Sequence, residues 1–313
     1  MKNNILSVVG LFLFLVFSSC KSKEVQFKDT MPDYIPYYLK VYDADSLFLS
    51  SNYNESNNIL DSLFKKHLPI NAEGYYEYSN YIISSIMTGR TKDIKNKIKY
   101  AYENFYGIGI MHMEYSKIGD SLNKYQNLFD KKEIEGFKEI YKKKIDFSLR
   151  NQIIMMVGKD QDIRNQSVIN IDSIINIRQK QEPIIKEIFS KVGYPARKII
   201  GRIDLDGKQD DFNLLLLHSD NSFKKNVLPF LLDEVKKGKY SPQDYAMIYD
   251  KSLQDLKIQY YGEFRKNETE LVDLINAKDI DSIRKTIGLP KLSYVFWKEK
   301  YIKRMIAKMQ SEY

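Results

Sequence analysis

His218 is the side chain in this sequence best suited to moving a proton. It follows four consecutive leucines in the segment 210–220, DDFNLLLLHSD. In a helix, Leu214, Leu215 and His218 share one face at spacings of three and four, so the imidazole falls on a side that should be buried. A buried imidazole needs partners for both ring nitrogens. We therefore expect polar side chains from elsewhere in the chain to meet His218.

A carboxylate and a guanidinium interrupt an apolar stripe earlier in the sequence. The stripe begins at Leu149 and, continued at helical spacing, reaches Asp160 and then Arg164. Charged groups four residues apart on a helix can pair, and Gln161 is close enough to join them. One interpretation is a functional polar cluster, in which Asp160 and Arg164 lie where the apolar core would otherwise continue. The other is an ordinary ion pair at the end of a helix, which has the same spacing. Both alternatives stay open.

The elements that must hold these side chains are helices. Segments of helical length are separated by turn residues throughout, and no convincing run with period two occurs. Ser241 and Pro242 are typical of an N-cap and a first helical residue, while Pro183 and Pro229 are expected to interrupt or kink their helices. The sequence predicts an all-α fold, with helical hairpins followed by a compact helical domain.

Two of the expected helices form a possible docking module. Residues 74–87 and 91–105 carry apolar side chains at helical spacing on either side of Gly89. This pattern resembles a tetratricopeptide hairpin, although a generic helical hairpin has the same pattern. The resemblance implies a protein or peptide partner for the first half of the chain.

The amino terminus has the form of a secretory signal. Ile5 to Phe17 is an almost uninterrupted apolar run that is too short to cross a bilayer. It ends in Phe17, Ser18, Ser19 and Cys20, which resembles the lipobox of bacterial lipoproteins. That resemblance implies cleavage before Cys20, a lipid on its sulfur and a place in the cell envelope, at the outer membrane and facing the periplasm or the surface. An ordinary signal peptide or an uncleaved anchor, with Cys20 incidental, is the alternative.

Length and composition support an organisation into two domains. The chain has 313 residues, of which 43% are hydrophobic, enough for sizeable cores. We expect a signal peptide over residues 1–19, a polar tether over 20–37, a helical-hairpin domain over 38–145 and a second helical domain over 146–313.

Charge and cysteine usage exclude several classes of function. The 49 Lys and Arg residues outnumber the 41 Asp and Glu residues, but the two signs are interspersed, so no nucleic-acid partner is expected. Cys20 is the only cysteine, which excludes a disulfide within the chain and a cysteine metal site. We expect neither a metal nor a cofactor.

Six short motifs in the second half resemble a bacterial family called domain of unknown function 6624. They are Asp160-Gln161-x-x-Arg164, Gly193-Tyr194-Pro195, His218-Ser219-Asp220, Tyr245-Ala246 with Asp250, Gln259-x-Tyr261-Gly262 and Gly288-Leu289-Pro290. Tyr194, Lys251 and Phe264 stand where the family usually has Trp, Arg and Gln. The resemblance covers about Leu149 to Tyr294 and implies no assigned activity. The polar residues that it picks out are Asp160, Gln161, Arg164, His218, Asp220, Asp250, Gln259 and Tyr261.

This set of residues fits two classes of function. An imidazole oriented by a carboxylate, with an arginine to hold an anion, is typical of a general acid and base in a hydrolase-like enzyme. No nucleophile is evident, because Ser219 and His218 face different ways as neighbours on a helix. A binding or interaction module with a polar pocket is the main interpretation and the enzyme is the alternative, while a purely structural cluster is the third possibility.

Overall fold

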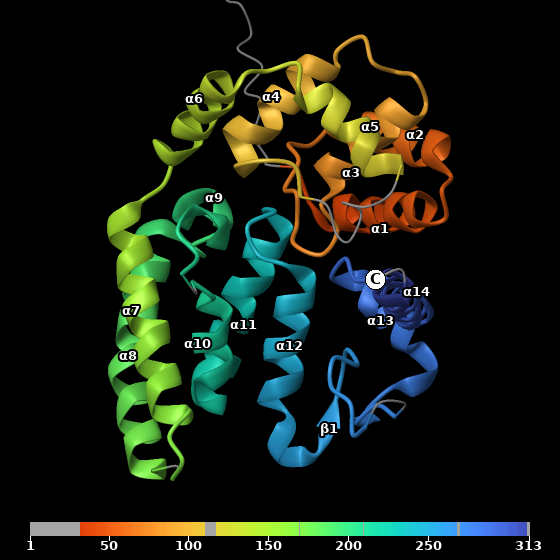
Figure 1. Ribbon diagram of the computed structural model, residues 1–313. Helices are drawn as coiled ribbons and strands as arrows, with labels where there is room; N and C mark the ends of the chain where they lie inside the picture. Colours follow the sequence, from red (N-terminus) through yellow and green to blue (C-terminus); the bar gives the residue numbers. More distant parts are fainter. Residues whose placement is uncertain (1–31, 110–116, 169, 209, 268–269, 312–313) are drawn as a thin grey trace, which may run out of the picture. The chain divides into compact units, whose positions relative to one another are not determined.

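The computed structural model describes residues 32–109, 117–168, 170–208, 210–267 and 270–311, and these residues are predominantly helical (Figure 1). The described α-helices are α1 (Ile35–Leu49), α2 (Tyr53–Phe64), α3 (Glu77–Met87), α4 (Ile94–Phe105), α5 (Lys117–Gln126), α6 (Lys131–Lys142), α7 (Phe147–Arg164), α8 (Ile171–Val192), α9 (Arg197–Ile200), α10 (Phe212–His218), α11 (Asn221–Lys236), α12 (Pro242–Ser252), α13 (Ile280–Thr286) and α14 (Leu292–Ser311). The predicted all-α fold is confirmed.

Short 3-10 helices and one small strand pair complete the described chain. They are η1 (Ile203–Leu205), η2 (Gln254–Leu256), η3 (Ala277–Asp279), β1 (Ile258–Gln259) and β2 (Asp273–Leu274). The two strands run parallel, with Ile258 opposite Asp273. They are too short to form a separate layer.

The first helices pack in sequence order. Helix α1 packs against α2 and α3, α2 against α3, α3 against α4, and α4 against α6. Gly89 ends the α3 segment in the left-handed region, at φ +71°, where a side chain would be strained. Consecutive helices therefore do form packed hairpins, and a specific likeness to tetratricopeptide repeats stays a prediction.

Side chains of α1 bind residues far along the chain. The Tyr38 hydroxyl donates to the carbonyl of Tyr240 at 3.0 Å, and Lys298 of α14 donates to the buried Asp45 carboxylate at 2.8 Å. The domain boundary expected at residue 145 falls in the connection between α6 and α7. Contacts nevertheless join residues on both sides of it, so the chain from Pro32 onward forms one compact unit.

Two prolines lie inside helices that continue past them. Helix α8 includes Pro183 and helix α11 includes Pro229, so the expected interruption at Pro183 is wrong. Both proline positions are exposed. The carbonyl four residues before each proline can bond to water there, which lowers the cost of the missing N–H. The other helix signals are confirmed: Ser241 accepts from the N–H groups of Gln243 and Asp244 and thereby caps α12.

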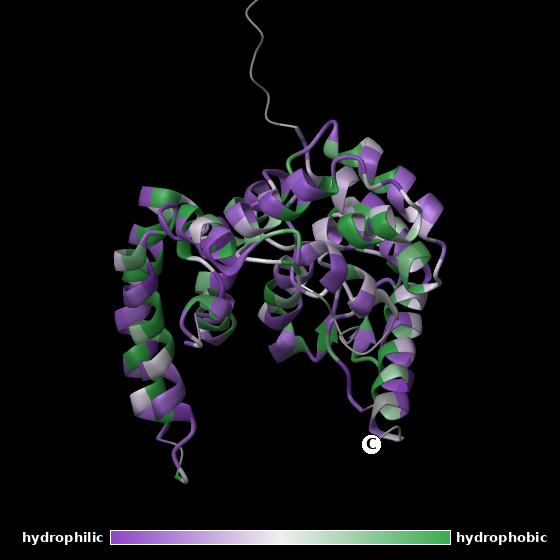
Figure 2. Ribbon diagram, turned by 45° about the horizontal axis from the view of Figure 1, so that its top comes forward, coloured by the Kyte–Doolittle hydropathy of each residue, from purple (hydrophilic) through white to green (hydrophobic). Residues whose placement is uncertain are grey.

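Helices α7, α10 and α12 carry most of the polar residues predicted for the site, and α8 and α11 pack beside them. Helix α7 lies beside α8 and also contacts α10, while α12 contacts both α10 and α11 (Figure 1). Hydrophobic and hydrophilic residues alternate along single helices, as expected where one face of each helix is buried (Figure 2).

Arg150 fixes the start of α10 against the start of α7. Its side chain is fully buried and donates to the carbonyl of Ile200 at 2.9 Å, to Asp206 and to Asp210. Asp210 directly precedes the N-cap of α10. This buried ion-pair network therefore sets the position from which α10 runs toward the end of α7.

Candidate functional site

The ends of α7 and α10 meet through a carboxylate and an imidazole. Nδ1 of His218, the last residue of α10, lies 2.5 Å from Oδ2 of Asp160. Asp160 is buried, with 2% of its side chain exposed, whereas 24% of the His218 side chain is exposed. Among the described residues, no hydrogen bond to Nε2 of His218 is present. One ring nitrogen is therefore held by the protein while the other is available to a ligand.

Asp160 is held in its ionised form by its neighbours. Nε of Arg164 donates to both carboxylate oxygens, at 3.0 and 3.1 Å, and Nε2 of Gln161 donates to Oδ2 at 3.1 Å. Burial by itself raises the pKa of Asp160, but the hydrogen bonds and positive charges of His218 and Arg164 outweigh it, so the pKa lies below its ordinary value. An ionised carboxylate fixes the orientation of the imidazole and favours a proton on Nδ1.

The sequence around His218 explains why α10 ends at this point. Asp211 caps the start of α10 by accepting from the N–H of Asn213 at 3.1 Å, and Leu215 is buried beneath the helix. Ser219 then adopts an extended conformation and donates its hydroxyl to the carbonyl of Leu215 at 2.8 Å. Because that hydroxyl is buried and committed to the backbone, Ser219 is not a free nucleophile.

Asp220 begins the next helix on the same side. Its carboxylate accepts from the N–H of Ser222 at 2.9 Å and thereby caps α11. Arg178 of α8 pairs with it at 3.4 Å, and the N–H of Asp220 donates to Glu182 at 2.8 Å. The turn between α10 and α11 is thus fixed against α8.

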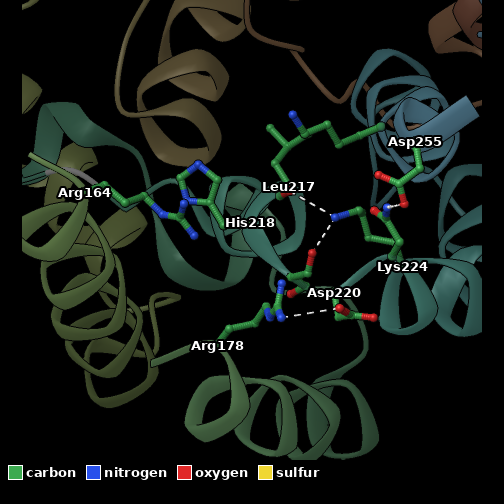
Figure 3. A pocket seen from close by; sticks show the side chains of 10 residues that line it. Arg164, Arg178, Leu217, His218, Asp220, Lys224 and Asp255 are labelled. Atoms are coloured by element: carbon green, nitrogen blue, oxygen red, sulfur yellow. Dashed lines mark hydrogen bonds and ion pairs between the residues drawn. The ribbon is translucent and has the colours of Figure 1, made fainter. Parts of the chain in front are cut away.

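A cavity of about 500 Å³ opens beside His218 (Figure 3). In this view Arg164 and His218 lie on the left, the Arg178–Asp220 ion pair lies below, and Lys224 lies on the right. The volume of the cavity is that of an ordinary small-molecule pocket. The charged side chains that line it are Arg164, Arg178, Lys224, Lys251, Asp220 and Asp255.

Positive charge dominates this pocket because four basic side chains line it against two carboxylates. Asp255 accepts from the Asn221 side chain at 2.6 Å, and Asp220 pairs with Arg178. Within the described part of the chain, Arg164 hydrogen-bonds only through Nε, so its two terminal nitrogens are left for a ligand. Lys251 forms no ion pair with any described carboxylate. The pocket is therefore suited to an anionic group.

The three remaining predicted residues form a separate structural clamp. The buried Asp250 carboxylate accepts from the N–H groups of Tyr260, Tyr261 and Glu263, at 2.7, 2.9 and 3.1 Å. Gln259 is also buried, and its amide group bonds to Phe264 and Val272 main-chain atoms.

Tyr261 completes this clamp with its ring and its main chain. Its ring packs edge-on against Tyr249, and its carbonyl accepts from Arg284. Asp250, Gln259 and Tyr261 therefore fix the loop after α12 and do not line the pocket. Their connection with the pocket is indirect: Asp250 fixes the end of α12, and the next residue, Lys251, lines the pocket.

Arg178, Lys224, Lys251 and Asp255 were not among the residues predicted for the site. Lys224 could have been predicted from the sequence, because it lies at helical spacing on the same face as the buried Leu228, Leu231 and Val235. A lysine at a core position needs a reason to be there. Arg178 and Asp255 have ordinary surface positions in the sequence, so only the packing of their helices brings them to the cavity.

Neither a metal nor a membrane span is indicated by the described part of the chain. No group of three or more His, Cys, Asp or Glu side chains in it is arranged to hold a metal ion. None of its helices has the length and apolar character needed to cross a bilayer. Cys20 and the expected signal peptide lie outside the described residues.

The chain was compared with known proteins at three levels. No protein-family model, curated protein or solved structure matches it.

Proposed function

We propose that this protein is a lipid-anchored protein of the bacterial cell envelope whose pocket beside His218 binds a small anionic ligand. The observation that carries the proposal is the convergence of Arg164, Arg178, Lys224 and Lys251 on one open cavity that is lined by two carboxylates, Asp220 and Asp255. Like charges gathered in this way repel one another, and an anion relieves that repulsion.

Titration with phenyl phosphate tests this proposal. Binding measured by calorimetry should weaken by about 10- to 150-fold in Arg164→Gln and in Arg178→Gln, because each loses a charged hydrogen bond of about 1.5–3 kcal/mol. Arg304→Gln is the matched control, since Arg304 is exposed and bonds only within α14. Equal affinity in all three variants and the wild type would contradict an anion site in this pocket.

Acid and base catalysis by His218 is the second candidate function, and the contact between His218 and Asp160 favours it. A buried carboxylate on Nδ1 of an imidazole that lines a ligand cavity is the arrangement that a general base or acid requires. With Ser219 committed to the backbone, the nucleophile of a hydrolase-like reaction would be water.

His218→Gln separates binding from catalysis. Glutamine keeps hydrogen-bonding capacity but cannot transfer a proton near neutral pH. In an enzyme, hydrolysis of p-nitrophenyl phosphate or p-nitrophenyl acetate should fall at least about a hundredfold while phenyl phosphate still binds. Unchanged hydrolysis in the variant would rule out His218 as the acid or base.

We further propose that acyl chains on Cys20 hold the folded body at the membrane and that the α1–α4 hairpins dock a protein or peptide partner. The lipobox-like residues Phe17 to Cys20 support the anchor. Cys20→Ser should shift the protein from the membrane fraction to the unprocessed or soluble form. Continued recovery of a processed form with membranes would contradict lipidation.

A further inference from the structure

Lys224 is a nearly buried amine in the wall of the pocket. Only 3% of its surface is exposed, and it lies one turn after Asp220 on α11. Nζ donates to the carbonyl oxygen of Leu217 at 3.2 Å and to that of Ser219 (Figure 3). Among the described residues, no carboxylate forms an ion pair with Nζ. The lysine is thus held by main-chain oxygens alone.

A neutral Lys224 amine can still donate to both of these carbonyl groups. A charged ammonium group has three N–H donors, of which two are used here, whereas a neutral amine has two donors and one lone pair. Loss of the third proton therefore breaks neither hydrogen bond and leaves a lone pair. Burial, and then the positive charge of Lys251, lowers the pKa of Lys224 to about 8. About a tenth of the amine is then neutral at pH 7, against less than about 0.1% for an ordinary lysine.

Besides a nucleophile, addition to the carbonyl group of an anionic compound needs a group that holds the anion and a group that transfers protons. Lys224 shares its cavity with side chains of both kinds. Arg164 and Arg178 can hold an anionic group, and His218 has one ring nitrogen available for a proton. A desolvated lysine beside a second cation is the arrangement that makes an amine nucleophilic.

We propose that Lys224 is a carbonyl-reactive nucleophile that forms an imine with an aldehyde or ketone carrying an anionic group. This inference rests on the proposed anion site, because the anionic group selects and orients the carbonyl compound. The lone pair of Nζ attacks the carbonyl carbon, and the carbonyl electron pair moves to oxygen, which takes a proton as Nζ loses one. The hydroxyl group then takes a second proton from His218 and leaves as water, the nitrogen lone pair forms the C=N bond, and the nitrogen returns its remaining proton to His218. His218 can relay these protons, and the step involves no oxidation or reduction.

Reductive trapping tests the proposal with pyridoxal 5′-phosphate as an anionic aldehyde. The full folded chain is incubated at pH 7 with limiting aldehyde and sodium cyanoborohydride, and the modified lysines are found by peptide mass spectrometry. Lys224 should be modified at least about tenfold faster than Lys97 or Lys198. Burial also lowers the pKa of these two lysines, and Lys198 is more exposed, but neither lines the pocket.

Two further arms separate the imine from anion binding. Lys224→Arg keeps a cation that can donate to the Leu217 and Ser219 carbonyls, so it should unfold at about the wild-type temperature while losing the selective modification. Pyridoxal lacks the phosphate, and its free 5′-hydroxyl closes onto the aldehyde, which slows its reaction with every lysine. The comparison is therefore one of selectivity: the ratio of Lys224 to Lys198 modification should be at least about tenfold lower with pyridoxal than with the phosphate ester.

The results that overturn the proposal differ from those that overturn the anion site. If phenyl phosphate binds but modification follows exposure, with Lys198 modified ahead of Lys224, the imine is wrong and the anion site stands. If both aldehydes modify Lys224 with the same selectivity over Lys198 and phenyl phosphate does not bind, the nucleophile stands and its anion selectivity is wrong.

Discussion

Asp160 and His218 lie 58 residues apart in the sequence, yet Oδ2 of one is 2.5 Å from Nδ1 of the other. The contact joins the last turn of α7 to the last residue of α10. The same carboxylate also binds Arg164 and Gln161. One buried group therefore sets the orientation of two side chains that face the pocket, Arg164 and His218.

Asp160→Asn should lower the free energy of unfolding by about 1–3 kcal/mol at neutral pH, because the amide loses the charge that pairs with Arg164 and His218. The pKa of Asp160 lies below its ordinary value in the folded protein, so its stabilisation is present above the unfolded pKa near 4 and is lost as pH falls through the folded pKa. The difference between variant and wild type should therefore shrink as the pH falls below about 4.

Denaturant unfolding at several pH values measures this difference. Asp162→Asn is the matched control, because Asp162 is an exposed residue of the same helix and should change stability by less than about 0.5 kcal/mol. If both variants lost the same free energy of unfolding, the contacts of Asp160 with Arg164 and His218 would contribute nothing to stability.

The part of this site that sequence could predict is the part made by side-chain periodicity. The stripe from Leu149 continues to the buried Asp160, and the leucine run places His218 at the edge of the core. Both placements follow from helical spacing alone. The meeting of the two helices depends on tertiary packing, notably on the buried Arg150 network at their other ends.

Asp250, Gln259 and Tyr261 show where that reasoning stops. They belong to the same motifs as His218, but Asp250 and Gln259 bond to main-chain groups of one loop, and Tyr261 offers its own main-chain N–H and carbonyl to Asp250 and Arg284. Main-chain partners leave no pattern in the sequence, so a structural clamp and a ligand site look alike there. The all-α fold was predictable because it rests on periodicity and on caps such as Ser241, which are local.

Asp250→Ala should lower the free energy of unfolding by about 3 kcal/mol or more, because three main-chain N–H groups lose their acceptor. Limited proteolysis should then cut the segment 258–275 faster than in the wild type. Asp233→Ala, a change at an exposed position of α11, is the control and should alter neither stability nor cleavage. Wild-type protection of the loop in Asp250→Ala would contradict the clamp.

Asp244, which does not line the pocket, is a carboxyl group whose raised pKa can be tested through the pH dependence of stability. It lies in the first turn of α12, and its Oδ1 accepts from the Asn213 side chain at 3.2 Å. Burial, and then the negative charge of Asp211, raises the pKa of Asp244 to about 7. Because the folded pKa exceeds the unfolded value of about 4, the folded protein binds the proton more tightly, and stability is lost as pH rises from about 4 to about 7.

Asp244→Asn stays neutral at every pH and keeps an oxygen for Asn213. We expect it to match the wild type below about pH 4 and to exceed its free energy of unfolding by about 1–3 kcal/mol above about pH 8, after allowing for the favourable helix N-terminus that the charged form gains. Denaturant unfolding at the two pH values measures the change, with Asp233→Asn as the exposed control. The same difference at both pH values would mean that Asp244 is not the group that titrates, because only a group with a raised pKa makes the advantage of the neutral variant grow with pH.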